Sequence, residues 1–177
     1  MEIKIKQFKE GKFPKIIRKG DWIDLYTAED VEIKGPIAGT RKRVMRKGVT
    51  TTTRPVTLFN TLIPLNVAMK LPDGCEAYLL PRSSTFIKHG IIMANSMGII
   101  DETYQGNNDE WKFSAIGIYP TFIPAGTAIA QFRVQLSQKA TFWQKVKWFF
   151  SNKIEIRMVE SLNGTDRGGF GTTNKQQ

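Results

Sequence analysis

A short stretch near the middle of the chain gathers side chains that suit phosphate chemistry. Arg82 offers a forked cation, and Ser83 and Ser84 add two short hydroxyl donors, a combination that matches phosphate oxygens. Asp101 ends an apolar run, where partial burial would hold its carboxylate ready as a general base. Tyr104 follows three residues later and offers a flat face for a nucleobase or a sugar. This order of residues predicts a phosphate clamp, a general base and a stacking surface.

The net charge of +10 is concentrated in two segments of the chain. Residues 34–54 hold seven basic side chains, residues 139–153 hold four, and neither segment contains Asp or Glu. Subtracting these eleven from the 26 Lys and Arg leaves 15 basic against 16 acidic residues, so the rest of the protein is nearly neutral. We interpret residues 35–55 as an insertion that forms a solvated loop or an extended hairpin. The alternative is a patch for nucleic acid or an acidic partner, because clustered cations attract phosphates.

The elements that position these residues are predicted to be short strands. Period-two alternation of apolar residues covers 2–8, 65–71, 76–80 and 111–119, with Gly, Pro and Asn turns between them. Alternation resumes at 154–160, which favours an all-β barrel or a jelly-roll-like domain.

The second basic segment, 139–153, has a different pattern. Phe142, Val146, Phe149 and Phe150 recur at helical spacing, which predicts a short helix packed on the domain or on a neighbouring subunit. A basic amphipathic helix on a membrane surface is the alternative.

Several features bear on the environment of the protein. A single cysteine, Cys75, and the lack of Cys/His spacing for zinc favour a reducing compartment. The N-terminus lacks the apolar segment of a signal peptide, and no stretch approaches a membrane span. His89, the only histidine, is interpreted as structural. We therefore expect a cytoplasmic protein, in the host cytoplasm if the chain is viral, with no membrane partner.

Five ordered motifs resemble those of the trimeric dUTP diphosphatases (dUTPases). Residues 81–84 match the family's PRSS motif, and residues 95–106 match N-x-x-G-[VIL]-I-D-x-x-Y-x-G without a gap. Residues 126–131 match G-x-x-I-[AC]-Q, and 167–173 match the Gly-rich R-G-x-G-G-F-G-[ST]-T with one residue missing between Arg and Phe. Residues 24–25 match only the Asp-Leu end of the first motif, A-G-[YF]-D-L.

The resemblance implies a distorted β-barrel of residues 1–160, assembled as a homotrimer with sites between subunits. A flexible C-terminal arm, 161–177, would close over a neighbour's site. The implied activity is hydrolysis of dUTP to dUMP and pyrophosphate with Mg²⁺, with Asp101 activating the attacking water and Asp24 orienting waters on the metal. The residues implied to bind substrate are Arg82, Ser83, Ser84, Asn95, Gly98, Ile99, Ile100, Tyr104, Gln131, Arg167, Phe170, Gly171, Thr172 and Thr173.

Two other functions are compatible with parts of the pattern. A deoxycytidine triphosphate deaminase shares the dUTPase fold, but it needs a catalytic glutamate where this chain has Gly-Ile-Ile-Asp. A non-enzymatic binding or regulatory protein would use the basic insertion at 35–55 instead. The Gly-Ile-Ile-Asp pattern and the Gly-rich tail favour the hydrolase over the deaminase, and the intact motifs argue against loss of activity but not against a second role.

Overall fold

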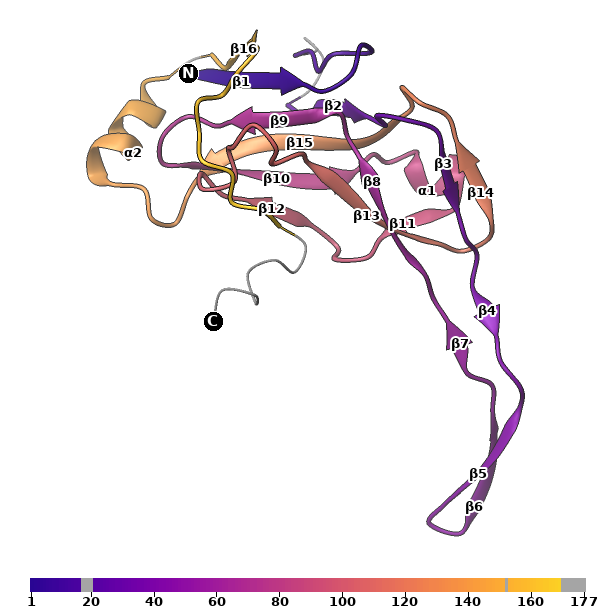
Figure 1. The fold of residues 1–177 in the computed structure, drawn as a ribbon. Coiled ribbons are helices and arrows are strands. Elements are labelled where there is room, and N and C mark those ends of the chain that lie inside the picture. Colours follow the sequence, from indigo (N-terminus) through magenta and orange to yellow (C-terminus); the bar gives the residue numbers. More distant parts are fainter. Residues whose placement is uncertain (17–20, 152, 170–177) are drawn as a thin grey trace.

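Two long strands, β10 (Cys75–Pro81) and β15 (Ala128–Leu136), form the centre of the fold. The structure is a computed structural model that describes residues 1–16, 21–151 and 153–169 (Figure 1). β10 and β15 pair antiparallel from Cys75 opposite Leu136 to Pro81 opposite Ala130. β12 (Gly98–Ile100) lies on the outer side of β10 and β2 (Ile23–Tyr26) on the outer side of β15, giving the sheet order β12-β10-β15-β2.

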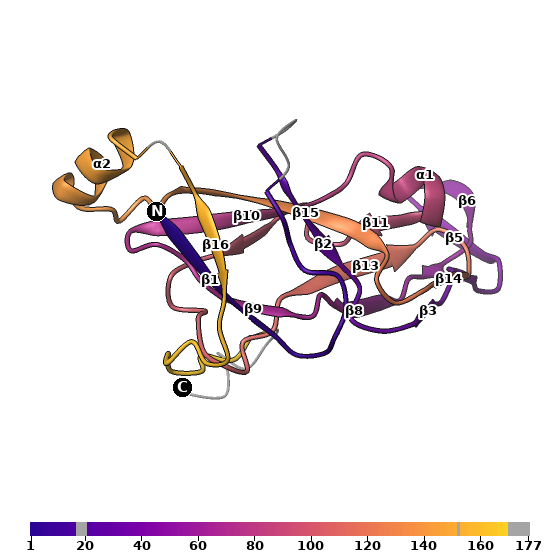
Figure 2. The same ribbon diagram turned by 90° about the horizontal axis from the view of Figure 1, so that it is seen from above.

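Smaller sheets surround this central sheet. β1 pairs parallel with β16 and antiparallel with β9, while β13 lies between β11 and β8, and β14 pairs with β3. Figure 2 shows β1 and β16 side by side, with the N-terminus close to the helix α2 (Phe142–Phe149). The bounds are β1 Glu2–Gln7, β3 Val31–Ile33, β8 Asn60–Pro64, β9 Val67–Lys70, β11 Ile91–Met93, β13 Lys112–Gly117, β14 Thr121–Ile123 and β16 Glu155–Met158.

Alternation along the strands places one set of side chains in a common core. In β1, Ile3 and Ile5 are fully buried while the lysines between and after them are not, as the period of two predicts. The largest buried side chains include Trp111, Phe113 and Phe132, and the rings of Trp111 and Phe132 meet edge to face at 5.2 Å. The predicted all-β architecture is confirmed, and the sheets form an open, jelly-roll-like arrangement.

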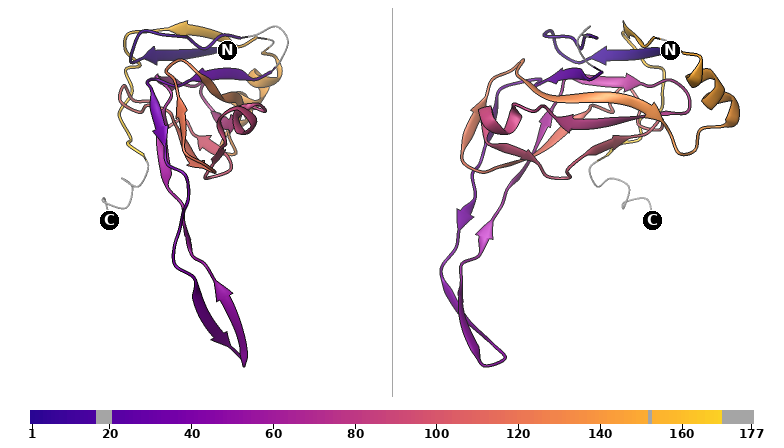
Figure 3. Two further views of the ribbon diagram at one scale, coloured as in Figure 1. Left: turned by 90° about the vertical axis from the view of Figure 1, so that its right-hand side faces the viewer. Right: turned by 180° about the vertical axis from the view of Figure 1, so that it is seen from behind.

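The basic insertion forms a long two-stranded arm that projects from one end of the body (Figures 1 and 3). β4 (Ile37–Ala38) pairs with β7 (Val56–Thr57), and further out β5 (Lys42–Arg46) pairs with β6 (Val49–Thr53). At the tip, Lys47 and Gly48 have φ of 50° and 77°, the signature of a two-residue turn that matches strand twist. The extended hairpin, one of the two predicted forms of 35–55, is therefore confirmed.

The predicted helix at 139–153 is also present, as α2 (Phe142–Phe149). Its first turn is closed by a capping box, in which the Thr141 hydroxyl accepts from the Gln144 backbone N–H and the Gln144 amide oxygen accepts from the Thr141 N–H. Trp148 packs against the core, and Gln144 fills the space left by Gly74, which has no side chain.

The apolar stripe of α2 does not pack on the domain of its own chain, and its contact with a neighbouring subunit stays a prediction. Phe142 and Phe149 are 69% and 80% exposed, so the stripe faces outward. The helix is fixed instead by its opposite side, through Gln144 and Trp148. Within the described residues, no helix is long and apolar enough to cross a membrane.

Candidate active site

One half of the site lies where β2, β15 and β10 run side by side. Strand register places Gln131 of β15 between Asp24 of β2 and Leu80 of β10. The Arg82 guanidinium, just past the end of β10, contacts Asp24 with 2.8 Å between Nε and Oδ1. The Gln131 side-chain amide donates to the Pro81 carbonyl at 3.3 Å. The PRSS motif, the G-x-x-I-[AC]-Q motif and the Asp-Leu end of the first motif therefore meet in one place. We call this group of residues the phosphate cluster (Asp24, Arg82 and Gln131).

The turn that carries Arg82 is held firmly by β15. The Arg82 backbone N–H and the Thr85 hydroxyl both donate to the carbonyl of Ile129, at 3.1 and 2.6 Å. Ser84 occupies the N-cap position of the short helix α1 (Thr85–His89), but its side chain makes no capping hydrogen bond. Ser83 is exposed. Neither serine is committed to the helix start, so both hydroxyls are available to an anionic ligand.

The other half of the site centres on Asp101, which follows β12. Its carboxylate accepts hydrogen bonds from the Thr103 backbone N–H at 2.9 Å and from the Thr103 hydroxyl. One guanidinium nitrogen of Arg167 donates to both carboxylate oxygens, at 3.1 and 3.2 Å. The motif at residues 95–106 and the start of the Gly-rich motif at 167–173 therefore meet within one chain. We call this group of residues the catalytic cluster (Asp101, Thr103 and Arg167).

Two opposing effects set the pKa of Asp101. Partial burial raises it, but the Thr103 hydrogen bonds and the Arg167 charge outweigh burial and leave the pKa below its ordinary value. The carboxylate is therefore ionised at neutral pH, as a general base requires. From the sequence we expected partial burial to set the state of the Asp101 carboxylate. The structure adds hydrogen bonds from Thr103 and the charge of Arg167, which lower the pKa of Asp101 where burial raises it.

Tyr104 lies beneath the C-terminal segment. Its hydroxyl donates to the Glu110 carbonyl at 3.0 Å, and burial, with the nearby charges of Asp109 and Glu110, raises its pKa to about 12. Gly169 passes close to the ring, where a Cβ would lie 3.2 Å from the Tyr104 Cε2. The phenol is neutral at physiological pH, and its ring is available as a packing surface.

Sequence reasoning missed Asp109, which holds the C-terminal segment in place. Its side chain is buried, and its carboxylate accepts from the backbone N–H groups of Gly106 at 2.8 Å, Gly168 at 2.9 Å, and Arg167. In the sequence, Asp109 has the pattern of an ordinary Asn-Asn-Asp turn, and no local signal reveals that two of its three partners, Arg167 and Gly168, lie nearly sixty residues away. Because it fixes the backbone at Arg167, Asp109 determines where that guanidinium can reach.

The C-terminal segment also contacts the loop after Tyr104 through its backbone. A Cβ on Gly106 would lie 2.4 Å from the Cα of Asp166, and a Cβ on Gly164 would lie 2.5 Å from the Gln105 carbonyl oxygen. The C-terminal segment therefore runs directly against the loop after Tyr104, and side chains at these two glycines would force the segments apart.

The residues predicted to read the base lie on an open strand edge. β12, which carries Gly98, Ile99 and Ile100, is the edge strand of the central sheet, and β11 pairs in a different sheet. The turn between them contains Asn95, which is exposed. The edge of β12 that faces away from β10 can therefore offer backbone donors and acceptors to a ligand.

The two clusters lie far apart within one chain. Asp101 follows Ile100, which is opposite Ala77 near the start of β10, whereas Arg82 follows the end of that strand. Six residues of extended strand, from the level of Glu76 to Arg82, correspond to about 20 Å. A single chain therefore separates the predicted general base from the predicted phosphate clamp.

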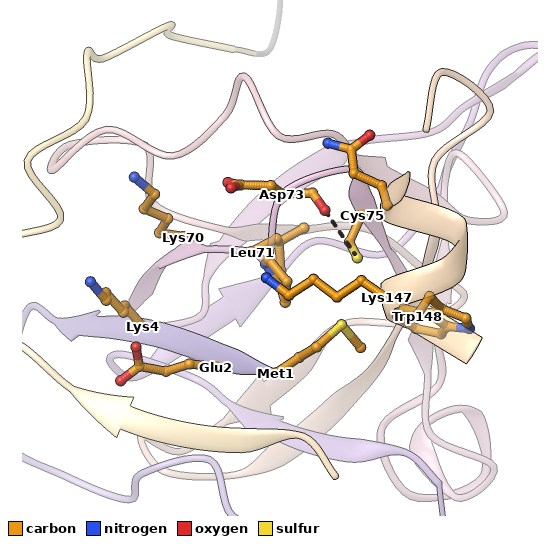
Figure 4. Close-up of a pocket in the computed structure, with 11 residues that line it drawn as sticks. Met1, Glu2, Lys4, Lys70, Leu71, Asp73, Cys75, Lys147 and Trp148 are labelled. Carbon is orange, nitrogen blue, oxygen red and sulfur yellow. Dashed lines mark hydrogen bonds between the residues drawn. The ribbon is translucent and has the colours of Figure 1, made fainter. Parts of the chain in front are cut away.

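The cavity shown in Figure 4 lies elsewhere, beneath α2. It has a volume of about 250 Å³ and is lined by residues that include Lys4, Lys70, Asp73, Cys75 and Trp148. Among the predicted site residues that the structure describes, none lines this cavity. The predicted residues Phe170, Gly171, Thr172 and Thr173 lie outside the described part of the chain.

A magnesium ion would rely on few protein ligands here. Among the described residues, no group of three or more His, Cys, Asp or Glu side chains is placed to hold a metal ion. The phosphate cluster contributes one carboxylate, that of Asp24, whose side chain is 15% exposed. This set fits Mg²⁺, which keeps several waters and is commonly bound by one or two carboxylates together with substrate phosphates.

Comparison with known proteins assigns the fold and motifs to a family. The family model described as dUTPase matches residues 48–173, most of the chain. The chain belongs to the dUTPase family, which confirms the resemblance found in its motifs. A curated relative, the SPbeta prophage-derived deoxyuridine 5'-triphosphate nucleotidohydrolase YosS of Bacillus subtilis, is 38% identical over 174 residues, covering 98% of each chain. The deoxyuridine 5'-triphosphate nucleotidohydrolase of Rickettsia canadensis is 39% identical over 63% of this chain and 67% of its own.

Solved structures share the fold at lower identity. The dUTPase of Streptococcus mutans superposes with a TM-score of 0.56 at 21% identity, over 75% of this chain and 94% of its own. The dUTPase from phage phi11 of Staphylococcus aureus gives a TM-score of 0.58 at 14% identity, over 79% of this chain and 93% of its own. These likenesses confirm the jelly-roll-like dUTPase fold.

Proposed function

We propose that the protein hydrolyses dUTP to dUMP and pyrophosphate. The observation that carries this proposal is the convergence of distant motifs, which bring Arg82 to Asp24 and Arg167 to Asp101. The curated relatives in Bacillus and Rickettsia are named as enzymes acting on deoxyuridine 5'-triphosphate. One residue set suits phosphate binding and the other suits activation of a water, which are the two requirements of this hydrolysis.

The separation of the clusters supports a site shared between subunits. A general base must lie within hydrogen-bonding reach of its water, which in turn must touch the phosphorus held by the clamp. About 20 Å of strand separates the two clusters in one chain, which is too far for this geometry. The separation therefore supports an oligomer in which the catalytic cluster of one subunit meets the phosphate cluster of another, and the resemblance to trimeric dUTPases makes a homotrimer the form that we propose.

In this scheme, Asp101 takes a proton from a water whose oxygen attacks the α-phosphorus. The bond from that phosphorus to the bridging oxygen breaks, and pyrophosphate leaves with its electron pair. Arg82, Ser83, Ser84 and Gln131 hold the phosphate oxygens. Arg167, with Thr172 and Thr173, closes on the terminal phosphates, so residues 161–177 act as the closing arm.

Arg167 then has two alternating partners. Without nucleotide it is paired with Asp101, and the terminal phosphates of dUTP present more negative charge than one carboxylate. Transfer of the guanidinium to the phosphates would leave the Asp101 carboxylate free to accept a proton from water. The pairing seen in this chain is the resting state of that exchange.

Magnesium has a supporting role in this proposal. The Asp24 carboxylate would orient waters of a Mg²⁺ ion bound to the triphosphate, and the ion would neutralise charge on the phosphate oxygens. A solved structure of the phage phi11 dUTPase is described as revealing the coordination of a structural Mg(II) ion in that protein. The Asp24 carboxylate lies 2.8 Å from the Arg82 guanidinium, so it already lies beside a group that would hold the phosphate oxygens.

Base and sugar recognition follow from the open strand edge and from Tyr104. Backbone groups of 95–100 would pair with the edge of uracil, and a tight fit there would exclude the thymine methyl group. A cytosine would leave buried polar groups mismatched. Tyr104 would pack on the deoxyribose and leave no room for a 2'-hydroxyl, while Phe170 would stack over the base.

The environment proposed for the enzyme is the cytoplasm, or the host cytoplasm if the chain is viral. Cys75 is a free, buried cysteine, and burial raises its pKa to about 11, so it remains an unreactive thiol. A free thiol is typical of a reducing compartment, where nucleoside triphosphates are also found.

The deciding experiment measures pyrophosphate release from dUTP, dTTP, dCTP and UTP, with and without Mg²⁺. We expect strong preference for dUTP and dependence on Mg²⁺. Equal turnover of the four nucleotides would contradict the proposal. Release of ammonia from dCTP instead of pyrophosphate from dUTP would indicate the related deaminase.

A further inference from the structure

The basic arm, residues 35–57, is not needed to build the site described above. It extends away from the body in every view of Figures 1 and 3, and none of the predicted site residues lies in it. In β5 and β6 every side chain is exposed except that of Val44, which is half-buried. A two-stranded ribbon without a core is marginally stable by itself. Because its side chains are exposed, the arm also adds nothing to the hydrophobic core of the body.

The arm carries positive charge without compensation. Residues 35–57 contain no Asp or Glu, and among the described residues no carboxylate forms an ion pair with the arm's cations. Repulsion between these like charges destabilises the ribbon, and a polyanion would relieve it. The six cations are Arg41, Lys42, Arg43, Arg46, Lys47 and Arg54.

Strand register distributes these cations over both faces of the ribbon. Lys42 and Arg46 alternate with Arg43 along β5, so they project from opposite faces. On β6, a run of four threonines lies opposite β5, with Thr53 paired to Lys42 and Thr52 paired to Arg43. Each face therefore combines cations with threonines. The hydroxyls of Thr51 and Thr53, on the face of Lys42, donate to carbonyls of β5, whereas those of Thr50 and Thr52, on the face of Arg43, point to solvent without such a bond.

A ribbon with cations on both faces suits a groove better than a flat surface. A membrane or an acidic protein surface would contact one face and leave the charges of the other unpaired. The major groove of duplex DNA is about 12 Å wide, admits a two-stranded β-ribbon and has phosphates along both sides.

We propose that the basic arm inserts into the major groove of duplex DNA. Its cations would contact phosphates on both walls, and the hydroxyls of Thr50 and Thr52 would donate to phosphates or base edges. Such contacts are largely independent of sequence, so the arm would hold the enzyme on DNA in general. This interaction is separate from nucleotide hydrolysis and does not depend on the proposed substrate.

The test is binding of a fluorescently labelled duplex of mixed sequence, followed by anisotropy at a series of salt concentrations. If all six cations of one arm contact phosphates, the slope of log affinity against log salt is about −5. This corresponds to a loss of about 10³-fold in affinity between about 50 and about 200 mM salt.

A triple variant, Arg43→Gln, Arg46→Gln, Lys47→Gln, removes half of the arm's charge. We expect the slope to become about −2.7, so that the same change in salt costs only about 40-fold in affinity. The matched control, Lys139→Gln, Lys145→Gln, Lys153→Gln, removes three charges from the segment around α2 and should leave duplex binding unchanged.

A deletion variant gives an independent measurement. The Gly39 N–H donates to the Pro55 carbonyl at 2.8 Å, so the two ends of the outer arm are adjacent and Asn-Gly can replace residues 40–54. Duplex binding should be lost while circular dichroism and dUTP hydrolysis are retained.

Several results would overturn the proposal. These are absence of duplex binding by the parent protein, full binding by the triple or the deletion variant, and equal affinity for a single strand of the same sequence. Binding to anionic lipid vesicles but not to the duplex would also overturn it. Loss of dUTP hydrolysis in the arm variants would assign the arm to the catalytic site instead.

Discussion

Arg167, near the C-terminus, donates from one guanidinium nitrogen to both carboxylate oxygens of Asp101, at 3.1 and 3.2 Å. The two residues are 66 positions apart in the sequence, and both are about half exposed. The contact joins the predicted general base to the segment predicted to close over the nucleotide. It therefore links the protonation of Asp101 to the position of that segment.

Replacing Arg167 with Gln should raise the pKa of Asp101. The guanidinium stabilises the ionised carboxylate, so its loss favours the protonated form. The acid limb of the kcat/KM profile for dUTP should move to higher pH, and kcat/KM on the plateau should fall because Arg167 also contacts phosphate. An acid limb in the same place as in the parent enzyme would contradict the assignment of Asp101 as the base.

The same pair gives a direction for stability against pH. Because the folded-state pKa of Asp101 is depressed below 3.8, its contribution to stability is present above the unfolded-state pKa and is lost as the pH falls through the folded-state value. The contribution is small, since both side chains are about half exposed and solvent screens the pair. The stabilities of the parent and of Arg167→Gln should therefore differ only slightly at neutral pH, and the difference should disappear as the pH falls through the folded-state pKa of Asp101.

Replacing Asp101 with Asn should abolish turnover and largely preserve nucleotide binding. The amide keeps the size of the side chain but cannot accept a proton from water at neutral pH. Calorimetry with a non-hydrolysable dUTP analogue measures binding, and pyrophosphate release measures turnover. Near-parental rates would rule out Asp101 as the general base.

Mixing two inactive variants tests the shared site. If Asp101 and Arg82 of one site come from different subunits, equal amounts of Asp101→Asn and Arg82→Ala, unfolded and refolded together, should recover about a quarter of the parental turnover. Each variant refolded alone serves as the control. If both residues belonged to the same chain, the mixture would stay as inactive as the separate variants.

Replacing Asp109 with Ala should release the C-terminal segment. The change leaves the backbone N–H groups of Gly106, Arg167 and Gly168 without their acceptor, at a cost of about 1–3 kcal/mol for each donor that remains buried. Hydrogen exchange at Arg167 and Gly168 should accelerate, and KM for dUTP should rise more than kcat falls. Asp166→Asn is the comparison, because its contacts with Asn108 are exposed and should matter less.

Replacing Asp24 with Asn should weaken the response to Mg²⁺. The amide is a poorer partner for metal-bound waters and cannot form the ion pair with Arg82. A titration of turnover with Mg²⁺ should require higher concentrations, while the melting temperature changes little because the Arg82 pair is partly exposed. An unchanged Mg²⁺ titration would exclude Asp24 from the metal site.

The sequence by itself determined most of the longer strands, the presence of the basic insertion and the residues of each motif. Alternation in residues such as Ile3 and Ile5 reports burial on one face of a strand, and this information is local. The helical spacing around Phe142 correctly predicted α2 but not the direction of its apolar side, since that depends on which neighbours fill the space beneath the helix.

Only the tertiary structure decided how the motifs come together. Pairing of β10 with β15 and β2 brings Asp24, Arg82 and Gln131 into one cluster, and the length of β10 places Asp101 far from them. The role of Asp109 could not be predicted from the sequence either. It depends on the backbone N–H groups that donate to the buried carboxylate, and two of these, from Arg167 and Gly168, lie far along the chain. Local patterns encode elements, whereas contacts between distant residues are fixed only when the strands pair and the core closes.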